Sequence, residues 1–194
     1  LNRVQYPIRI VAIAVMLSLW SACQTADPPD TDLALSNDEF SATIDSLSEP
    51  SAFFDSDNII SNEISYLHVI EAMENIGVQG GVYIGVGPDQ NFTYIARIKP
   101  KYAFILDIRR DNVLEHLLFK AIMELADSRT EYLSILFSKP TSTVIPSSEL
   151  TNIAHLVDYF DNIEGDEAYF NENLLQIKDR INTYKIDLSQ TDWE

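Results

Sequence analysis

The chain has 194 residues, a length that suits one domain with additional segments. Its hydrophobic share of 46% and charged share of 22% are those of a globular protein that buries a core. The net charge of −17 argues against nucleic acid as a partner, because phosphates would be repelled. The single cysteine, Cys23, excludes an internal disulfide and a metal site built from cysteines.

The N-terminal residues 1–22 have the organisation of an export signal. Arg3 and Arg9 precede the apolar run 10–22, and Cys23 follows Ser-Ala at the end of that run. The run is too short to span a bilayer comfortably. This pattern resembles a bacterial lipoprotein signal, although Trp20 stands where an aliphatic residue is usual. The resemblance implies lipidation of Cys23 and a membrane anchor on the extracytoplasmic, periplasmic side of the cell envelope. An ordinary signal peptide and an uncleaved anchor are the alternatives.

Residues 23–50 are rich in Asp, Ser, Thr and Pro and offer little apolar surface to bury. This composition predicts a flexible acidic tether, within which the weakly apolar stretch 33–47 could form only a marginal helix. Farther along, apolar residues at helical spacing predict a helix over 62–76, and Gly77 suits the position that follows a helix.

Residues 80–112 form the unit around which the chain is organised: GGVYIGVGPDQNFTYIARIKPKYAFILDIRRDN. The apolar runs 82–86 and 103–108 predict two strands of a buried parallel sheet. A glycine turn and Pro88 follow the first run and predict the start of a helix, which ends before Lys99-Pro100. The order is therefore strand, glycine turn, helix and strand.

This order is the one that nucleoside-binding units require. Glycines let the backbone approach a ligand, and a helix N-terminus presents free N–H groups. Asp107 ends the second strand 22 residues after Gly85, where a carboxylate can accept hydrogen bonds from ribose hydroxyls. A tight turn in any α/β protein and a loop-capping role for Asp107 are the alternative interpretations.

The remainder of the chain is predicted to be helical. Asn112 with Glu115 has the spacing of an N-cap and its partner and predicts a helix to Ala126. Further helices are expected over 132–138, 148–163 and 167–184. Two strands are too few for a stable open α/β domain. We therefore expect either that the chain is truncated at its C-terminus or that a small helix-rich unit completes itself by association.

Three stretches carry a family resemblance: SNEISYLHV, GGVYIGVGPDQNFTYIARIKP and FILDIRRDNVLEHLLFKAIMELA. They resemble an uncharacterised bacterial family whose members look like class I S-adenosylmethionine-dependent methyltransferases, over roughly residues 50–140. The resemblance implies an α/β fold with a Rossmann-like, class I methyltransferase-like parallel sheet over 51–140, incomplete in this chain. A helical C-terminal segment over 141–194 would follow it.

The same resemblance implies a cofactor site for S-adenosylmethionine. Gly85 and Gly87 would be the loop glycines beneath the cofactor, Asp107 would bind the ribose hydroxyls, and Ile108 would flank the adenine. Asp89 occupies the third glycine position and would line the loop. Its negative charge argues against NAD or FAD, whose pyrophosphate would lie there, whereas S-adenosylmethionine carries no phosphate.

Two functions therefore remain open. The first is a membrane-anchored S-adenosylmethionine-binding domain, with methyltransferase activity as the reaction it implies. The second is a non-catalytic extracytoplasmic binding or structural lipoprotein on a degenerate methyltransferase-like scaffold. Tyr83, which replaces the usual acid, and the export signal favour the second, because S-adenosylmethionine is not expected outside the cytoplasm. No catalytic residue, methyl acceptor, small-molecule substrate or protein partner can be assigned, and His68, His116 and His155 are scattered.

Overall fold

The computed structural model describes residues 34–50, 52–53, 55, 59–61, 65–141 and 152–193. The predicted signal and Cys23 lie outside these residues. Contacts divide the chain after Ala34, and the fold described below is that of residues 35–194.

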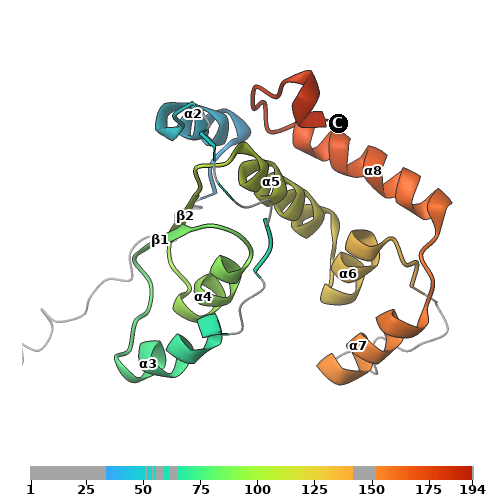
Figure 1. Ribbon diagram of the computed structural model, residues 1–194, viewed down its shortest axis with the longest axis horizontal. Coiled ribbons are helices and arrows are strands. Elements are labelled where there is room, and N and C mark those ends of the chain that lie inside the picture. The colour runs from blue at the N-terminus through green and yellow to red at the C-terminus, as the bar shows by residue number, and fades with distance from the viewer. Residues whose placement is uncertain are drawn as a thin grey trace, which may run out of the picture. The chain divides into compact units, whose positions relative to one another are not determined.

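Two parallel strands stand at the centre of the predicted unit. β1 (Val82–Val86) pairs with β2 (Tyr102–Leu106) in a continuous parallel register, from Val82 opposite Tyr102 to Val86 opposite Leu106. The helix α4 (Gln90–Ile98) connects them, as Figure 1 shows. Lys99 ends α4 in a left-handed conformation, with φ of 50°. The predicted succession of strand, turn, helix and strand is confirmed.

Helices make up most of the other described residues. The segment predicted as one helix over 62–76 is, where described, a 3₁₀ turn followed by a short α-helix. The helical elements are α2 (Asn37–Leu47), η2 (Ser65–Val69), α3 (Ile70–Asn75), α5 (Arg110–Leu125), α6 (Arg129–Phe137), α7 (Ile153–Asn162), α8 (Glu167–Asn182) and η4 (Gln190–Trp193).

The predicted fold class is wrong. The described residues form a helix-rich fold with α2 to α8 and a sheet of only two strands, not a Rossmann-like, methyltransferase-like parallel sheet. The error has a physical origin in the two apolar runs, which we expected to be buried on both faces. Val82, Ile84 and Val86 are instead 60%, 67% and 69% exposed, so the described helices leave one face of β1 open.

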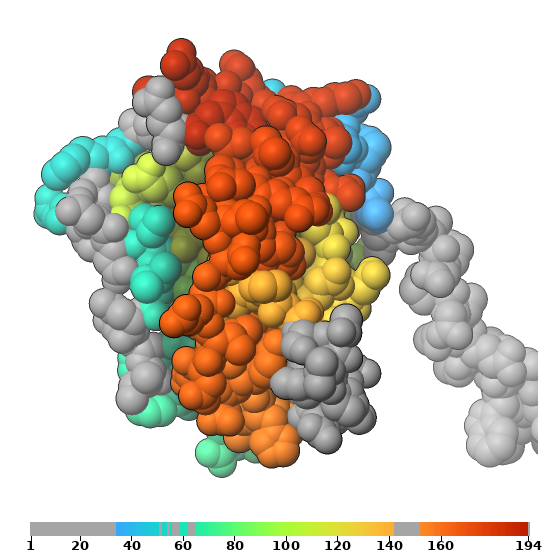
Figure 2. Space-filling model, turned by 90° about the vertical axis from the view of Figure 1, so that its right-hand side faces the viewer, coloured from blue at the N-terminus to red at the C-terminus, as the bar shows by residue number. Residues whose placement is uncertain are grey.

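The main core lies between helices rather than on the sheet. It joins buried side chains of α5, α6 and α8 with that of Tyr184, which follows α8. The helical members are Leu117, Ala121, Ile122, Ile135, Ile177 and Ile181. The helices α5 and α8 run side by side (Figure 1). Figure 2 shows the face that α8 forms, with the C-terminal segment at one end and α7 at the other. A smaller cluster around Leu156 and Phe160 attaches α7 to Leu133 of α6.

The helix α2 lies within the range 23–50 that was predicted as a tether, and it packs on the core. Ser36 and Glu39 form a reciprocal capping box at its start. The ring of Phe40 contacts that of Tyr184 edge-on at 5.9 Å. None of the helices among the described residues combines the length and the apolar character needed to cross a bilayer.

Candidate functional site

The paired strand ends bring Gly87 and Asp107 together. Gly87 N–H donates to the carbonyl of Leu106 at 3.0 Å, directly beyond the last strand pair. Gly87 has a φ of +85°, which disfavours any residue with a side chain. A Cβ atom at this position would lie 3.9 Å from Oδ2 of Asp107. The carboxylate of Asp107 therefore lies beside the glycine turn, as the spacing predicted.

The two oxygens of Asp107 have different environments. Oδ1 accepts a hydrogen bond from Arg109 N–H at 2.8 Å, and Arg109 Nε is 3.7 Å from the same oxygen. The side chain of Asp107 is only 11% exposed. No group of the described residues donates a hydrogen bond to Oδ2. One oxygen thus caps the loop that enters α5, and the other lies beside the buried Gly87.

Gly85 has a structural explanation. It is buried, and a Cβ atom there would overlap the amide oxygen of Asn91 and come within 2.6 Å of the Tyr83 hydroxyl. Those two groups are hydrogen-bonded, since the Tyr83 hydroxyl donates to Asn91 Oδ1 at 2.7 Å. Glycine at position 85 is therefore required by side-chain packing within the unit.

Asn91 is the centre of the turn, although the sequence pattern did not single it out as a site residue. It is 1% exposed, and its Nδ2 approaches the carbonyl oxygens of Val86, Gly87 and Pro88 at 3.2, 3.1 and 2.7 Å. His116 Nε2 lies 3.0 Å from the same Gly87 carbonyl. One feature of the sequence could have identified Asn91: it is a polar residue in a helix, α4, whose other sheet-facing residues are apolar.

The other two predicted site residues contact the segment that precedes the unit. Asp89 precedes α4, and its Oδ1 accepts a hydrogen bond from Ser61 N–H at 2.7 Å. It therefore anchors the preceding loop. The Ile108 side chain is 50% exposed, and its carbonyl accepts a hydrogen bond from Ala52 N–H at 3.1 Å.

The start of α5 contributes buried polar groups that the sequence did not predict as site residues. Asn112 was expected to cap this helix, but α5 begins at Arg110 and Asn112 lies inside it. Asn112 is fully buried, and neither atom of its amide has a partner among the described residues. Oε2 of Glu115 and Nδ1 of His116 are also buried without partners. The spacing of these three residues places them on one side of the helix.

Burial raises the pKa of the Glu115 carboxyl to about 7. The negative charge of Asp89 adds to this rise, and Arg109 opposes it. The ring of His116 packs edge-on against Phe92 at 5.6 Å. If its Nε2 donates to the Gly87 carbonyl, the neutral ring leaves Nδ1 as an acceptor.

The arrangement is suited to binding. It offers the free oxygen of Asp107 and the unpaired acceptors of Asn112, Glu115 and His116 near the N-termini of α4 and α5. Within the described ranges, no three His, Cys, Asp or Glu side chains are placed to hold a metal ion.

Comparison with known families gives one similarity. A model of a domain of unknown function, DUF7790, matches residues 58–152. This range contains β1, α4, β2, α5 and α6 and all five residues predicted to bind the cofactor, and it ends before α7. No curated protein and no solved structure matches the chain.

Proposed function

We propose that this chain is a membrane-tethered binding protein whose β1–α4–β2–α5 segment binds a nucleoside-containing small molecule, with S-adenosylmethionine as the specific candidate. The observation that carries the proposal is the partnerless oxygen of Asp107 beside Gly87. A ribose hydroxyl would donate to Oδ2, and the absence of a side chain at Gly87 would let the ligand approach the backbone.

The charges near this position support the choice of ligand. Asp89 and Asp107 lie near the turn, and Arg109 offsets only part of their charge. An excess of carboxylates repels phosphate groups and favours a cation. S-adenosylmethionine has a ribose, a sulfonium cation and no phosphate. The proposal covers binding alone.

The tether is proposed from the export signal. Lipidation at Cys23 would hold the domain at the membrane on the extracytoplasmic side. A Cys23→Ala variant should move from the membrane fraction to the aqueous fraction, whereas Ser21→Ala should not. Retention of Cys23→Ala in the membrane would contradict the lipid anchor and leave the binding proposal unaffected.

Calorimetric titration with S-adenosylmethionine tests the binding site. Asp107→Asn should weaken affinity by about tenfold, because a charged hydrogen-bond acceptor is replaced by a neutral one. Asp111→Asn is the matched control, since Asp111 is an exposed residue in the first turn of α5. Absence of heat at millimolar ligand, from a wild-type chain shown to be folded by circular dichroism, would overturn the proposal.

The second candidate is a non-catalytic envelope lipoprotein that has kept the turn without the ligand. The observation in its favour is that two of the predicted site residues have structural roles. Gly85 packs against Asn91, and Asp89 accepts a hydrogen bond from Ser61 N–H. Wild-type protein that is folded, membrane-bound and unable to bind S-adenosylmethionine would support this candidate.

A further inference from the structure

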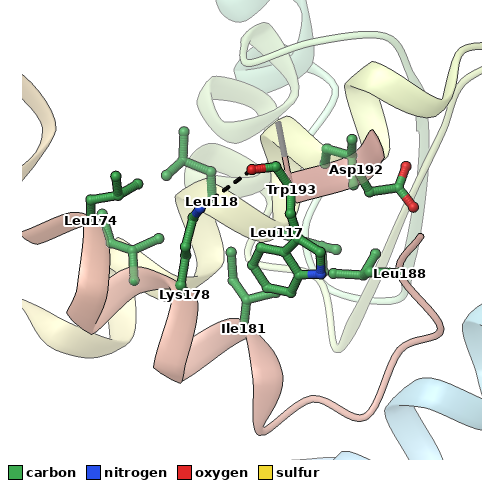
Figure 3. A pocket seen from close by; sticks show the side chains of 10 residues that line it. Leu117, Leu118, Leu174, Lys178, Ile181, Leu188, Asp192 and Trp193 are labelled. Atoms are coloured by element: carbon green, nitrogen blue, oxygen red, sulfur yellow. Dashed lines mark hydrogen bonds between the residues drawn. The ribbon is translucent and has the colours of Figure 1, made fainter. Parts of the chain in front are cut away.

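A cavity of about 160 Å³ lies between α5, α8 and the C-terminal segment, away from the turn described above. Figure 3 shows the side chains that line it. Apolar groups dominate, among them Leu117 and Leu118 of α5, Leu174 and Ile181 of α8, and Trp193 of η4. The core on which this cavity borders is independent of the proposed ligand site.

The wall that η4 forms is fixed by charged contacts. The Arg110 guanidinium donates to both carboxylate oxygens of Asp192, at 3.3 and 3.1 Å, and to the carbonyl of Asp187 at 3.0 Å. Asp192 also lines the cavity, but its charge is offset by Arg110, which lowers the pKa of that carboxyl. These contacts tie the wall to the start of α5.

Lys178 is the other charged residue at the cavity. Its Nζ donates to the Trp193 carbonyl at 3.3 Å and lies 5.9 Å from the centre of the Trp193 ring. No carboxylate of the described residues pairs with it, although the protein has 30 acidic and 13 basic residues. An ammonium group without an acidic partner therefore lies beside an apolar hollow (Figure 3).

We propose that this cavity binds a small amphipathic monoanion, with an apolar body of about six carbon atoms in the hollow and a carboxylate at Lys178. The size follows from the volume, since an apolar protein cavity of about 150 Å³ accommodates benzene. The apolar lining disfavours water as the occupant, because a buried water needs several polar partners. The carboxylate head follows from charge complementarity with Lys178, whose ammonium would gain an ion pair without losing one.

Hexanoate is a suitable probe, with 1-hexanol as its uncharged counterpart. Titration of the full chain would follow the indole N–H resonance of Trp193, assigned with a Trp193→Phe variant because Trp20 is a second indole. Both compounds should shift this resonance. Lys178→Met keeps the apolar stem and should weaken hexanoate by about fivefold while leaving hexanol unchanged. Lys101→Met, an exposed site at the start of β2, is the charge-matched control.

A cavity-filling variant separates binding in the hollow from binding elsewhere. Leu174→Phe should abolish the Trp193 shift for both compounds, with the fold monitored by circular dichroism. No shift with either compound at millimolar concentration would overturn the proposal. Equal hexanoate affinity in the wild type and in Lys178→Met would also overturn it, because the anionic head would then have no role.

Discussion

The amide oxygen of Asn91 occupies the space that a Cβ atom on Gly85 would need. The Tyr83 hydroxyl, which donates to that oxygen at 2.7 Å, fills the neighbouring space. The absence of a side chain at Gly85 therefore lets α4 pack closely on β1, and the hydrogen bond between Tyr83 and Asn91 joins the two elements.

Gly85→Ala should therefore destabilise the protein by about 1–3 kcal/mol, because overpacking forces Asn91 or Tyr83 out of place. Gly165→Ala is the matched control. A Cβ at position 165 would meet its nearest neighbour, the Ser138 carbonyl oxygen, at an ordinary 3.7 Å. Urea denaturation of the two variants compares them directly. Equal stabilities would show that the turn tolerates a methyl group and that the packing argument is wrong.

Asn91→Leu keeps the approximate shape of the side chain and removes its hydrogen bonds. The carbonyl groups of Val86, Gly87 and Pro88 would lose a donor, and the Tyr83 hydroxyl would lose its acceptor. The expected loss is about 1–3 kcal/mol in the free energy of unfolding, the cost of leaving buried polar groups unsatisfied.

Asn162→Leu is the control for this loss of stability. Asn162 is exposed on α7, and its Nδ2 donates to the carbonyl and the carboxylate of Asp158 in the same helix. Thermal or urea unfolding measures both variants. If Asn91→Leu were no less stable than Asn162→Leu, Asn91 could not be the residue that organises the turn.

The raised pKa of Glu115 predicts that the stability of the protein depends on pH. Its pKa is about 7 in the folded protein, above the value of 4.5 for an exposed carboxyl, so the folded state holds the proton more tightly. Its contribution to stability is complete below pH 4.5 and is lost as the pH rises toward and through 7. Glu115→Gln should remove this dependence, and at pH 8 it should be more stable than the wild type by up to about 3 kcal/mol.

The test is the difference in unfolding free energy between Glu115→Gln and the wild type, measured from pH 4 to pH 8. Glu164→Gln, at an exposed position between α7 and α8, accounts for the general effect of removing one negative charge. A difference that stayed constant with pH for Glu115→Gln would contradict the burial of an unpaired carboxyl.

Tyr184 anchors the core to the charged surface. It is 1% exposed, and its hydroxyl donates to Glu124 Oε2 at 2.7 Å. Burial, followed by the effect of Glu124, raises the pKa of the hydroxyl well above its usual value. Tyr184→Phe should cost about 1–2 kcal/mol, because a hydrogen bond to a charged acceptor is lost while the ring contact with Phe40 remains.

Tyr102→Phe is the control, since the Tyr102 hydroxyl makes no hydrogen bond with the described residues. Denaturant unfolding compares the two variants. A loss of stability in Tyr102→Phe as large as in Tyr184→Phe would show that the hydroxyl of Tyr184 has no special role.

The sequence located most elements because their signals are local. The turn glycines and Pro88 mark the interval between β1 and α4. Ser128 lies three residues before Glu131, the spacing of an N-cap and its partner, and it caps α6, with Glu131 N–H donating to Ser128 Oγ at 3.1 Å. Helix boundaries differ by a few residues, as at α5, which starts at Arg110 without a side-chain cap and not after Asn112.

The sheet and the site were harder to predict because both depend on tertiary contacts. The sequence of an apolar strand is the same whether helices cover one of its faces or both. The 67% exposure of Ile84 therefore could not be predicted from the sequence. The sequence also does not distinguish a glycine that a neighbouring side chain requires, such as Gly85, from one that a ligand requires. The buried amide of Asn112 could be found only by placing α5 against the turn.

The open face of β1 has a consequence for the behaviour of many copies together. Val82, Ile84 and Val86 form an exposed apolar row on a strand, a surface that favours contact between molecules. The net charge of −17 opposes such contact by mutual repulsion. That repulsion is screened within about 3 Å in 1 M salt, whereas the apolar attraction persists. The colloidal state of this protein should therefore be set by ionic strength, with light scattering rising as salt is added and falling again on dilution.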